Sequence, residues 1–302
     1  MTWKAVKRDF RMNWQIYVMA LPMIVYFIVF NYVPMLGIVM AFQRFSPRHG
    51  YFKSPWIGLQ NFRDFFGSYY FLRLLRNTFL ISFLSLLFAF PAPVIFALLL
   101  NEVRNRYFKK TVQTISYMPH FISMVVIAGL IRDFTDTDGL ITMMVAALGG
   151  QQRNLLSDPS LFRTIYVGSE IWQGIGFNSI IFLAALSAVD QELYEAAIID
   201  GAGRWKQTLH ITIPSIAPTI IIMLILRMGS LFSVGFEKII LLYTPMTYET
   251  ADVISSFTYR KGLLEANYGY STAVGLFNSV INFSMLLVAN FFSRKYSETS
   301  LF

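Results

Sequence analysis

The 302-residue sequence contains no cysteine and has few charges, only 14% of its residues. The lack of cysteine excludes disulfides, thiolate metal sites and a cysteine nucleophile. The charged fraction is far below the about 25% that is usual in soluble domains. In contrast, 55% of the residues are hydrophobic, 17% are aromatic and the mean hydropathy is +0.52. This composition predicts a polytopic membrane protein, with aromatic rings facing lipid and its interfaces.

Motifs for nucleotide binding and catalysis are also missing. No G-x-x-x-x-G-K followed by Ser or Thr occurs, so the chain has no loop of that kind for ATP phosphates. Its three histidines show no H-E-x-x-H spacing, and no Ser/His/Asp set is evident. The triplet Asp136-Thr-Asp138 matches the metal-binding DxD of some sugar transferases, but a solvated loop explains so short a match. We therefore predict no catalytic residue, no metal site and no cofactor bound by this chain.

Six apolar runs are long enough to cross a bilayer core, which takes roughly 20 helical residues. They predict an all-α, polytopic membrane protein with six transmembrane helices. Pro34 predicts a tilt or break in the first run, and Pro91 and Pro93 predict a kink in the second. The shorter apolar stretch 239–243 is predicted to be interfacial. The six runs are Ile16–Phe42, Thr78–Leu100, Val112–Ile131, Thr164–Val189, Ile216–Phe236 and Thr272–Phe292.

Basic residues predict which way the spans face. Twelve of them crowd into short segments, whereas the other side carries twelve spread over three longer loops. Because dense basic residues in short loops orient a membrane protein, we expect both termini in the cytoplasm and the basic N-terminus to be a retained anchor. The orientation of the chain in the membrane then explains its net charge of +8, and we predict no nucleic-acid partner. The twelve are Lys4, Lys7, Arg8, Arg11, Arg104, Arg106, Lys109, Lys110, Arg204, Lys206, Arg294 and Lys295.

A short mixed-charge segment interrupts the apolar pattern between the fourth and fifth spans. It reads EAAIIDGAGRWKQTLHITIP over residues 195–214. Asp190 and Glu192 suit the N-terminus of a helix that ends at Gly201-Ala-Gly203, since glycine tolerates unusual backbone angles. Residues 204–210 can form a second short helix, and Pro214 fits the opening turn of the fifth span. The predicted result is a cytoplasmic helix–bend–helix bracket, with a solvated connector as the alternative.

The spacing of this segment resembles the EAA loop of ATP-binding-cassette (ABC) importer permeases. The matching positions are Glu195, Ala196, Ala197, Gly201, Ile211 and Pro214, with Ile213 where the family usually has Leu. Asp200 and Ala202 also suit the carbohydrate-uptake branch. The stretches FNYVPMLGIVMAF, MPHFIS, LAALSAVDQELYEAA and FFSRKYSETSLF look like maltose-permease-like, oligosaccharide-importing members of the family.

The resemblance implies a type I importer permease fold and a set of partners. Residues 1–75 would hold the N-terminal tail, first helix and outer loop, residues 76–293 the transmembrane core with its coupling loop at about 190–214, and residues 294–302 the cytoplasmic tail. The expected partners are a second permease, two ATPase subunits that bind ATP and Mg, and an extracellular solute-binding protein. The chain would lie in a bacterial cytoplasmic membrane and pass an oligosaccharide, with acidic ones among the candidates. The expected ATPase-coupling residues are Glu195, Ala196, Ala197, Asp200, Gly201, Ala202, Arg204 and Pro214.

Polar side chains within the spans are candidates for the substrate path, because charges at membrane depth are costly. In the fourth span, Glu170, Gln173 and Asn178 share one broad face, with Trp172 nearby. Arg227 is the basic residue well inside a span. It could meet an anionic sugar, pair with Glu170 or Glu237, or snorkel, and we favour structural pairing.

Glu170 and His120 each have a structural interpretation as well as a functional one. Glu170 could equally serve helix packing, and a lone histidine such as His120 is more often packed than a ligand.

Two other function classes remain possible at this stage. An ion-gradient-driven secondary sugar transporter predicts duplicated halves with matching interrupted spans, and no such duplication is evident. An intramembrane sugar transferase predicts paired carboxylates or a metal set, for which only Asp136 and Asp138 are available.

Overall fold

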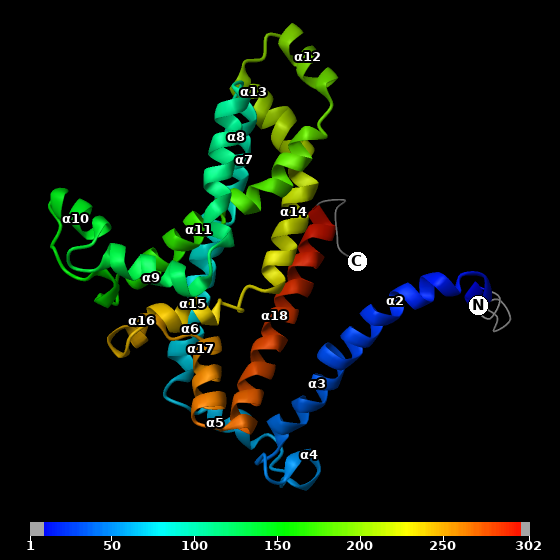
Figure 1. Ribbon diagram of the computed structural model, residues 1–302, viewed down its shortest axis with the longest axis vertical. Coiled ribbons are helices and arrows are strands. Elements are labelled where there is room, and N and C mark those ends of the chain that lie inside the picture. Colours follow the sequence, from blue (N-terminus) through cyan, green and yellow to red (C-terminus); the bar gives the residue numbers. More distant parts are fainter. Residues whose placement is uncertain (1–8, 297–302) are drawn as a thin grey trace. The chain divides into compact units, whose positions relative to one another are not determined.

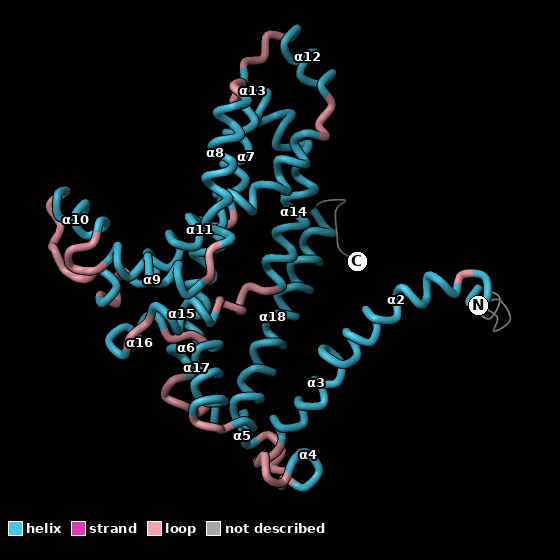
Figure 2. The backbone as a smooth tube through the Cα atoms, viewed as in Figure 1, coloured by secondary structure: helices cyan, strands magenta, loops and turns pink. Residues whose placement is uncertain are grey.

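The computed structural model describes residues 9–296, which form helices joined by loops and no strand (Figure 2). Gln43 and Trp56 form an isolated antiparallel bridge. Lys4, Lys7 and Arg8 of the predicted cytoplasmic tail, and residues 297–302 of the C-terminal tail, lie outside the described part. The chain divides into two compact units, Met1–Gly67 with Lys261–Leu276, and Ser68–Arg260 with Phe277–Phe302, which are described separately.

In the first unit, a single helical run covers Trp14–Phe42 and is long and apolar enough to cross a membrane. It comprises α2 (Trp14–Phe27), the π turn η1 (Ile28–Tyr32), α3 (Val33–Met35) and the 3-10 helix η2 (Leu36–Phe42). The break allowed for at Pro34 does not occur. The π turn before the proline widens the backbone where its ring would otherwise clash.

The rest of this unit is held by a buried amide. Asn61, in α5 (Gln60–Phe66), donates to the backbone oxygens of Ala41 at 2.9 Å and Gln43 at 3.2 Å. A Cβ on Gly269 would overlap the Gln43 carbonyl, so this close approach requires glycine. The unit also contains α4 (Gly50–Lys53) and the start of α18 (Tyr268–Tyr296).

The second unit begins with a helical run over Phe71–Glu102 that is a candidate span. It comprises α6 (Phe71–Leu84), the π turn η3 (Ser85–Ala89) and α7 (Pro91–Glu102). The predicted irregularity at Pro91 takes the form of that π turn, in which the Phe90 N–H reaches back to the Ser85 carbonyl at 3.1 Å.

The predicted third span over Val112–Ile131 does not form one unbroken helix. The chain instead bends by 104° between Arg106–Phe121 and Met124–Ala147. Pro119 cannot donate a backbone hydrogen bond, and the Ser123 side chain accepts from Val126 and begins a new helix. The elements are α8 (Arg106–Tyr117), η4 (Met118–Phe121), α9 (Met124–Thr135) and α10 (Leu140–Ala147).

The remaining helices include α11 (Phe162–Ser187), the coupling-loop elements α12 (Gln191–Ile199) and α13 (Arg204–Gln207), the π turn η6 (Thr208–Thr212) and α14 (Ile213–Gly229) (Figure 1). The fifth span ends at Gly229, short of the predicted Phe236, and a loop leads to α15 (Phe236–Leu242). The short helices α16 (Tyr248–Ala251) and α17 (Ile254–Tyr259) follow. Four described helices can cross a membrane, and the number rises to six if each of two bent pairs is one span. The all-α class and the six-span expectation are confirmed on that count.

Two apolar cores hold the second unit together. One joins α6, α9, α11 and α15 through Ile81, Ile127, Phe162 and Ile239. The other joins α7, α11 and α14 through residues that include Val94, Phe182 and Ile216. Stretch 239–243, predicted to be interfacial, contributes fully buried Ile239 and Leu242 to the first core. Both cores fix α11, which carries the candidate path residues.

Candidate functional site

The coupling loop forms a bracket between α11 and α14, as its glycines predict. The Asp190 side chain accepts a 3.0 Å hydrogen bond from the Glu192 backbone and caps α12. The helix ends at Gly201, whose φ of +74° favours glycine. Figure 1 shows α12 and α13 together at one end of α11 and α14.

The second arm of the bracket differs from the prediction. Residues 204–210 do not form a separate short helix but the first part of the continuous span Arg204–Gly229. Pro214 therefore lies within a helical run, and the preceding π turn η6 accommodates its missing N–H. The second arm of the bracket and the fifth span are therefore one continuous helical run.

Three side-chain contacts make the bracket rigid. The hydroxyls of Tyr194 and Thr212 lie 2.9 Å apart and tie α12 to the base of the fifth span. Gln207 donates to the Ala202 carbonyl at 2.7 Å and closes the bend. Arg204 lies 3.7 Å from Glu102 at the end of α7, in an exposed ion pair.

The bracket also carries exposed apolar side chains. Ile199 is 86% exposed and Trp205 is 74% exposed, and Leu193 and Ile198 are exposed as well. Glu195, Ala196 and Asp200 are exposed on the same short helix or its end, while Ala197 is half-buried. The sequence prediction missed Ile198 and Trp205, although large apolar residues in a polar loop are a readable signal.

A second group of candidate residues lines two cavities beside α11. The first cavity, of about 300 Å³, includes Asn178, Phe182 and Met223, and the second, of about 410 Å³, includes Gln173 and Lys238. Glu170, Arg227 and Ser230 line both cavities.

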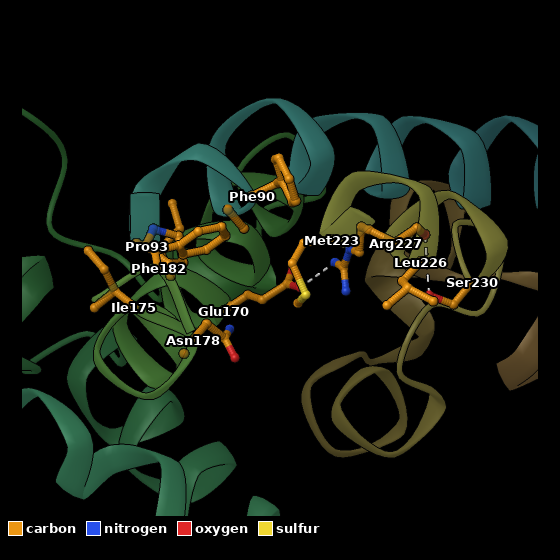
Figure 3. A pocket seen from close by; sticks show the side chains of 13 residues that line it. Phe90, Pro93, Glu170, Ile175, Asn178, Phe182, Met223, Leu226, Arg227 and Ser230 are labelled. Atoms are coloured by element: carbon orange, nitrogen blue, oxygen red, sulfur yellow. Dashed lines mark hydrogen bonds and ion pairs between the residues drawn. The ribbon is translucent and has the colours of Figure 1, made fainter. Parts of the chain in front are cut away.

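Of the two carboxylates considered as partners of Arg227, Glu170 and Glu237, the structure pairs it with Glu170. A guanidinium nitrogen lies 2.7 Å from one carboxylate oxygen, and the two side chains point toward each other in Figure 3. The other oxygen of Glu170 accepts a 2.6 Å hydrogen bond from Ser85, which opens the π turn η3. This turn sits beside the ion pair, a setting in which such irregular turns often serve function.

Lys238 is a functional candidate that the sequence prediction missed. It belongs to α15, outside the candidate spans, and is 4% exposed. Its ammonium lies 3.4 Å from the Tyr166 carbonyl and 4.9 Å from the centre of the Tyr166 ring. Within residues 9–296 it forms no ion pair with a carboxylate. Burial lowers the pKa of Lys238 to about 8, although the charge of Glu170 opposes that shift.

The other sequence candidates lie elsewhere. Trp172 is on a different side of α11, where it lines a groove with Pro119 and Ile175. His120 is exposed and stacks on Phe177 with ring centres 3.8 Å apart.

Asp136 and Asp138 accept hydrogen bonds from Asn154 and Gln152 in an outer loop. The described residues contain no group of three potential metal ligands.

Comparison with known proteins decides the family. A model of the family described as "Binding-protein-dependent transport system inner membrane component" matches residues 89–298. The chain belongs to this family. It is thus a membrane component of a binding-protein-dependent transport system, and the expected ABC importer permease with a type I fold is confirmed.

Individual relatives of this family member cover nearly its whole length. Protein LplB of Bacillus subtilis (strain 168) is 45% identical over 99% of this chain and 93% of its own length. The polygalacturonan/rhamnogalacturonan transport system permease protein YteP of the same organism is 42% identical over 95% and 90%, respectively. A chain of a bacterial alginate ABC transporter, solved in complex with an alginate pentasaccharide-bound periplasmic protein, superposes with a TM-score of 0.89 at 45% identity, covering 99% of both chains.

Proposed function

We propose that this permease moves an acidic oligosaccharide across a bacterial cytoplasmic membrane, with both termini in the cytoplasm. The substrate class is supported by the named substrates of two relatives, polygalacturonan or rhamnogalacturonan and alginate, which are acidic polysaccharides. The second cavity is compatible with it, because Arg227, Lys238 and Gln173 line it, together with the carboxylates of Glu170 and Glu237. Uronate carboxylates and sugar hydroxyls both find partners in such a lining.

The observation that carries the transport mechanism is the rigid bracket with exposed apolar side chains. Exposed Ile199 and Trp205 on a hydrogen-bonded support fit a docking surface for another protein. The partner we assign to it is an ATPase subunit, since the chain has no phosphate-binding loop. Glu195, Ala196, Ala197, Asp200, Gly201, Ala202, Arg204 and Pro214 are the proposed coupling residues.

The complete transporter would contain this chain, a second permease, two ATPase subunits holding ATP and Mg, and an extracellular solute-binding protein. Closure of the ATPase pair on ATP would push the bracket and, through the continuous fifth span, rotate α14 relative to α11. The cavities would then open alternately to the two sides. A ligand can shift such an equilibrium only through its different affinity for the two states.

Uptake by the reconstituted complex tests this function. Proteoliposomes containing the permease pair and ATPase are given the binding protein loaded with trigalacturonate, alginate trisaccharide or maltotriose, and labelled sugar inside is measured. We expect ATP-dependent uptake of at least one acidic trisaccharide and little of maltotriose. ATP-independent uptake driven by an ion gradient would instead support a secondary transporter, and uptake of maltotriose alone would refute the acidic substrate class.

A further inference from the structure

The ion pair between Glu170 and Arg227 lies at the boundary between the two cavities. Both residues line both cavities, together with Ser230. The first cavity continues toward Phe182 on α11, which is nearer the coupling bracket, and the second continues toward Tyr166 and Lys238 at the other end of α11. A solute in either cavity therefore has both side chains in the lining around it.

The pair leaves much of the guanidinium free. One nitrogen of Arg227 contacts one oxygen of Glu170, and this is the side-chain hydrogen bond that Arg227 makes within residues 9–296. The side chains of Arg227 and Glu170 remain 41% and 28% exposed. A guanidinium carries five N–H donors and binds a carboxylate best through two of them. Arg227 is thus reachable from a cavity and not saturated by its partner.

The second cavity has a further positive charge without a carboxylate partner. Lys238 contacts the Tyr166 carbonyl and ring. Glu237 also lines the cavity, but it is exposed and forms no ion pair within the described residues. Arg227 and Lys238 thus face Glu170 and Glu237 around this boundary, and Glu170 is the one carboxylate of the two that pairs with either cation within the described residues. A buried cation without a counter-ion raises the local affinity for an anion.

We propose that the carboxylate of an acidic sugar replaces Glu170 at Arg227, and that this exchange makes Arg227 the residue that selects acidic substrates inside the membrane. The inference rests on the proposed function and adds the site of selection. Glu170 keeps its hydrogen bond from Ser85 when it is displaced, so it does not lose all its partners. A neutral sugar offers Arg227 no replacement charge. It therefore passes only if Arg227 and Glu170 separate without a new ion pair to replace the one they lose.

Selective uptake by matched variants tests the exchange. The complex is reconstituted with its binding protein, and uptake of trigalacturonate is compared with uptake of its methyl ester, each above the concentration that saturates the binding protein. Wild type should prefer the acid by about tenfold or more, the scale of discrimination when a built charge site is left unpaired. The double variant Glu170→Gln with Arg227→Gln removes the charges as a pair and should lose this preference, so that the acid and the ester are imported at similar rates.

A single variant gives an independent readout. Glu170→Gln removes the competing carboxylate, so the KM for trigalacturonate should fall about tenfold, and the KM for the ester, which gains no charge contact with Arg227, should fall much less. A purely structural pair would not lower KM. Arg106→Gln, an exposed arginine on α8, is the matched control for loss of one positive charge and should keep the preference.

Each outcome decides something. If wild type imports the acid and the double variant keeps the full preference for it, the exchange is refuted and the proposed function stands. The same holds if Glu170→Gln leaves the KM for the acid unchanged. If wild type imports neither alginate nor galacturonate oligosaccharides, the acidic substrate class itself fails, and the exchange fails with it.

Discussion

Replacing Asp252 should destabilise the permease more than replacing an acid whose arginine partner is exposed. Its carboxylate is fully buried and bonded to Arg260 through two contacts of 2.7 and 3.1 Å. Arg73 of α6 lies 3.5 Å away, and Ser256 donates to the same group at 2.8 Å. The Asp252 carbonyl also accepts from Asn77 at 3.0 Å, so one residue ties the short helices α16 and α17 to the first span of the second unit.

The variant Asp252→Asn keeps the shape and removes the charge. It leaves two arginines without their counter-ion, and breaking a buried pair in this way costs about 3–5 kcal/mol. We take the lower end of this range, because the side chains of Arg73 and Arg260 are 23% and 19% exposed, respectively. About 3 kcal/mol corresponds to a fall in melting temperature of roughly 6–12 °C.

Thermal unfolding of the purified complex measures this fall. The control is Asp158→Asn, which removes the acid of an ion pair with Arg153, a side chain that is 55% exposed. Solvent already screens that pair, so its loss should barely move the melting temperature. A melting temperature for Asp252→Asn within about 2 °C of wild type would show that the network does not hold these short helices.

Three further predictions follow from packing, burial and orientation. Gly176→Ala would place a methyl group against the Ser116 carbonyl, so α8 and α11 should separate. The stability measured by thermal unfolding should fall by about 1–3 kcal/mol, and the yield of folded permease should fall with it. Lys238→Met removes a buried charge; the pKa of Lys238 is lowered from 10.5 to about 8, which corresponds to about 3 kcal/mol against the charged form. The variant should melt higher than wild type at pH 7, and the difference should shrink as the pH rises from 8 toward 10.5, because wild type then loses the same charge. A lower melting temperature for the variant at pH 7 would contradict this. Cysteine introduced at exposed Gln152 should react with an impermeant thiol reagent outside intact cells and cysteine at Arg106 should not, whereas the reverse would overturn the orientation.

The coupling bracket could be predicted from the sequence because its determinants are local. Asp190 caps a helix that Gly201 ends, and both signals act within a few residues of the chain. The continuity of Arg204–Gly229 was missed, since Pro214 normally marks a helix start and only the π turn before it reveals the exception. The bend after α8 was missed for a similar reason. Pro119 in an apolar run is compatible with a mere kink, and the Ser123 cap decides between the two.

The cavity could be predicted only in part because its determinants are distant in sequence. Glu170 and Arg227 were candidates, but the choice between Glu170 and Glu237 as the partner needed the geometry of α11 and α14. Lys238 reads in the sequence as an ordinary polar residue beside an apolar stretch. Its burial comes from packing onto Tyr166, 72 residues away.

The central claim is that the bracket of α12 and α13 transmits ATP-driven movement to the membrane. Two substitutions alter its surface while sparing the fold. A side chain at Gly201 meets nothing within 4 Å, and aspartate is among the residues that tolerate a positive φ. Ala197→Asp places a carboxylate on the half-buried side of α12, where an unpartnered charge in a docked interface costs roughly a few kcal/mol.

The most direct test is the rate of ATP hydrolysis by reconstituted complexes with and without the loaded binding protein. Wild type and Arg106→Glu, a charge change on exposed α8, should respond to the loaded binding protein. Gly201→Asp and Ala197→Asp should insert normally, yet either lose the ATPase subunit on purification or hydrolyse ATP without responding, and import no sugar. If both variants retain the ATPase, respond to the binding protein and import sugar at wild-type rates, the bracket is a solvated connector and the account of coupling is wrong.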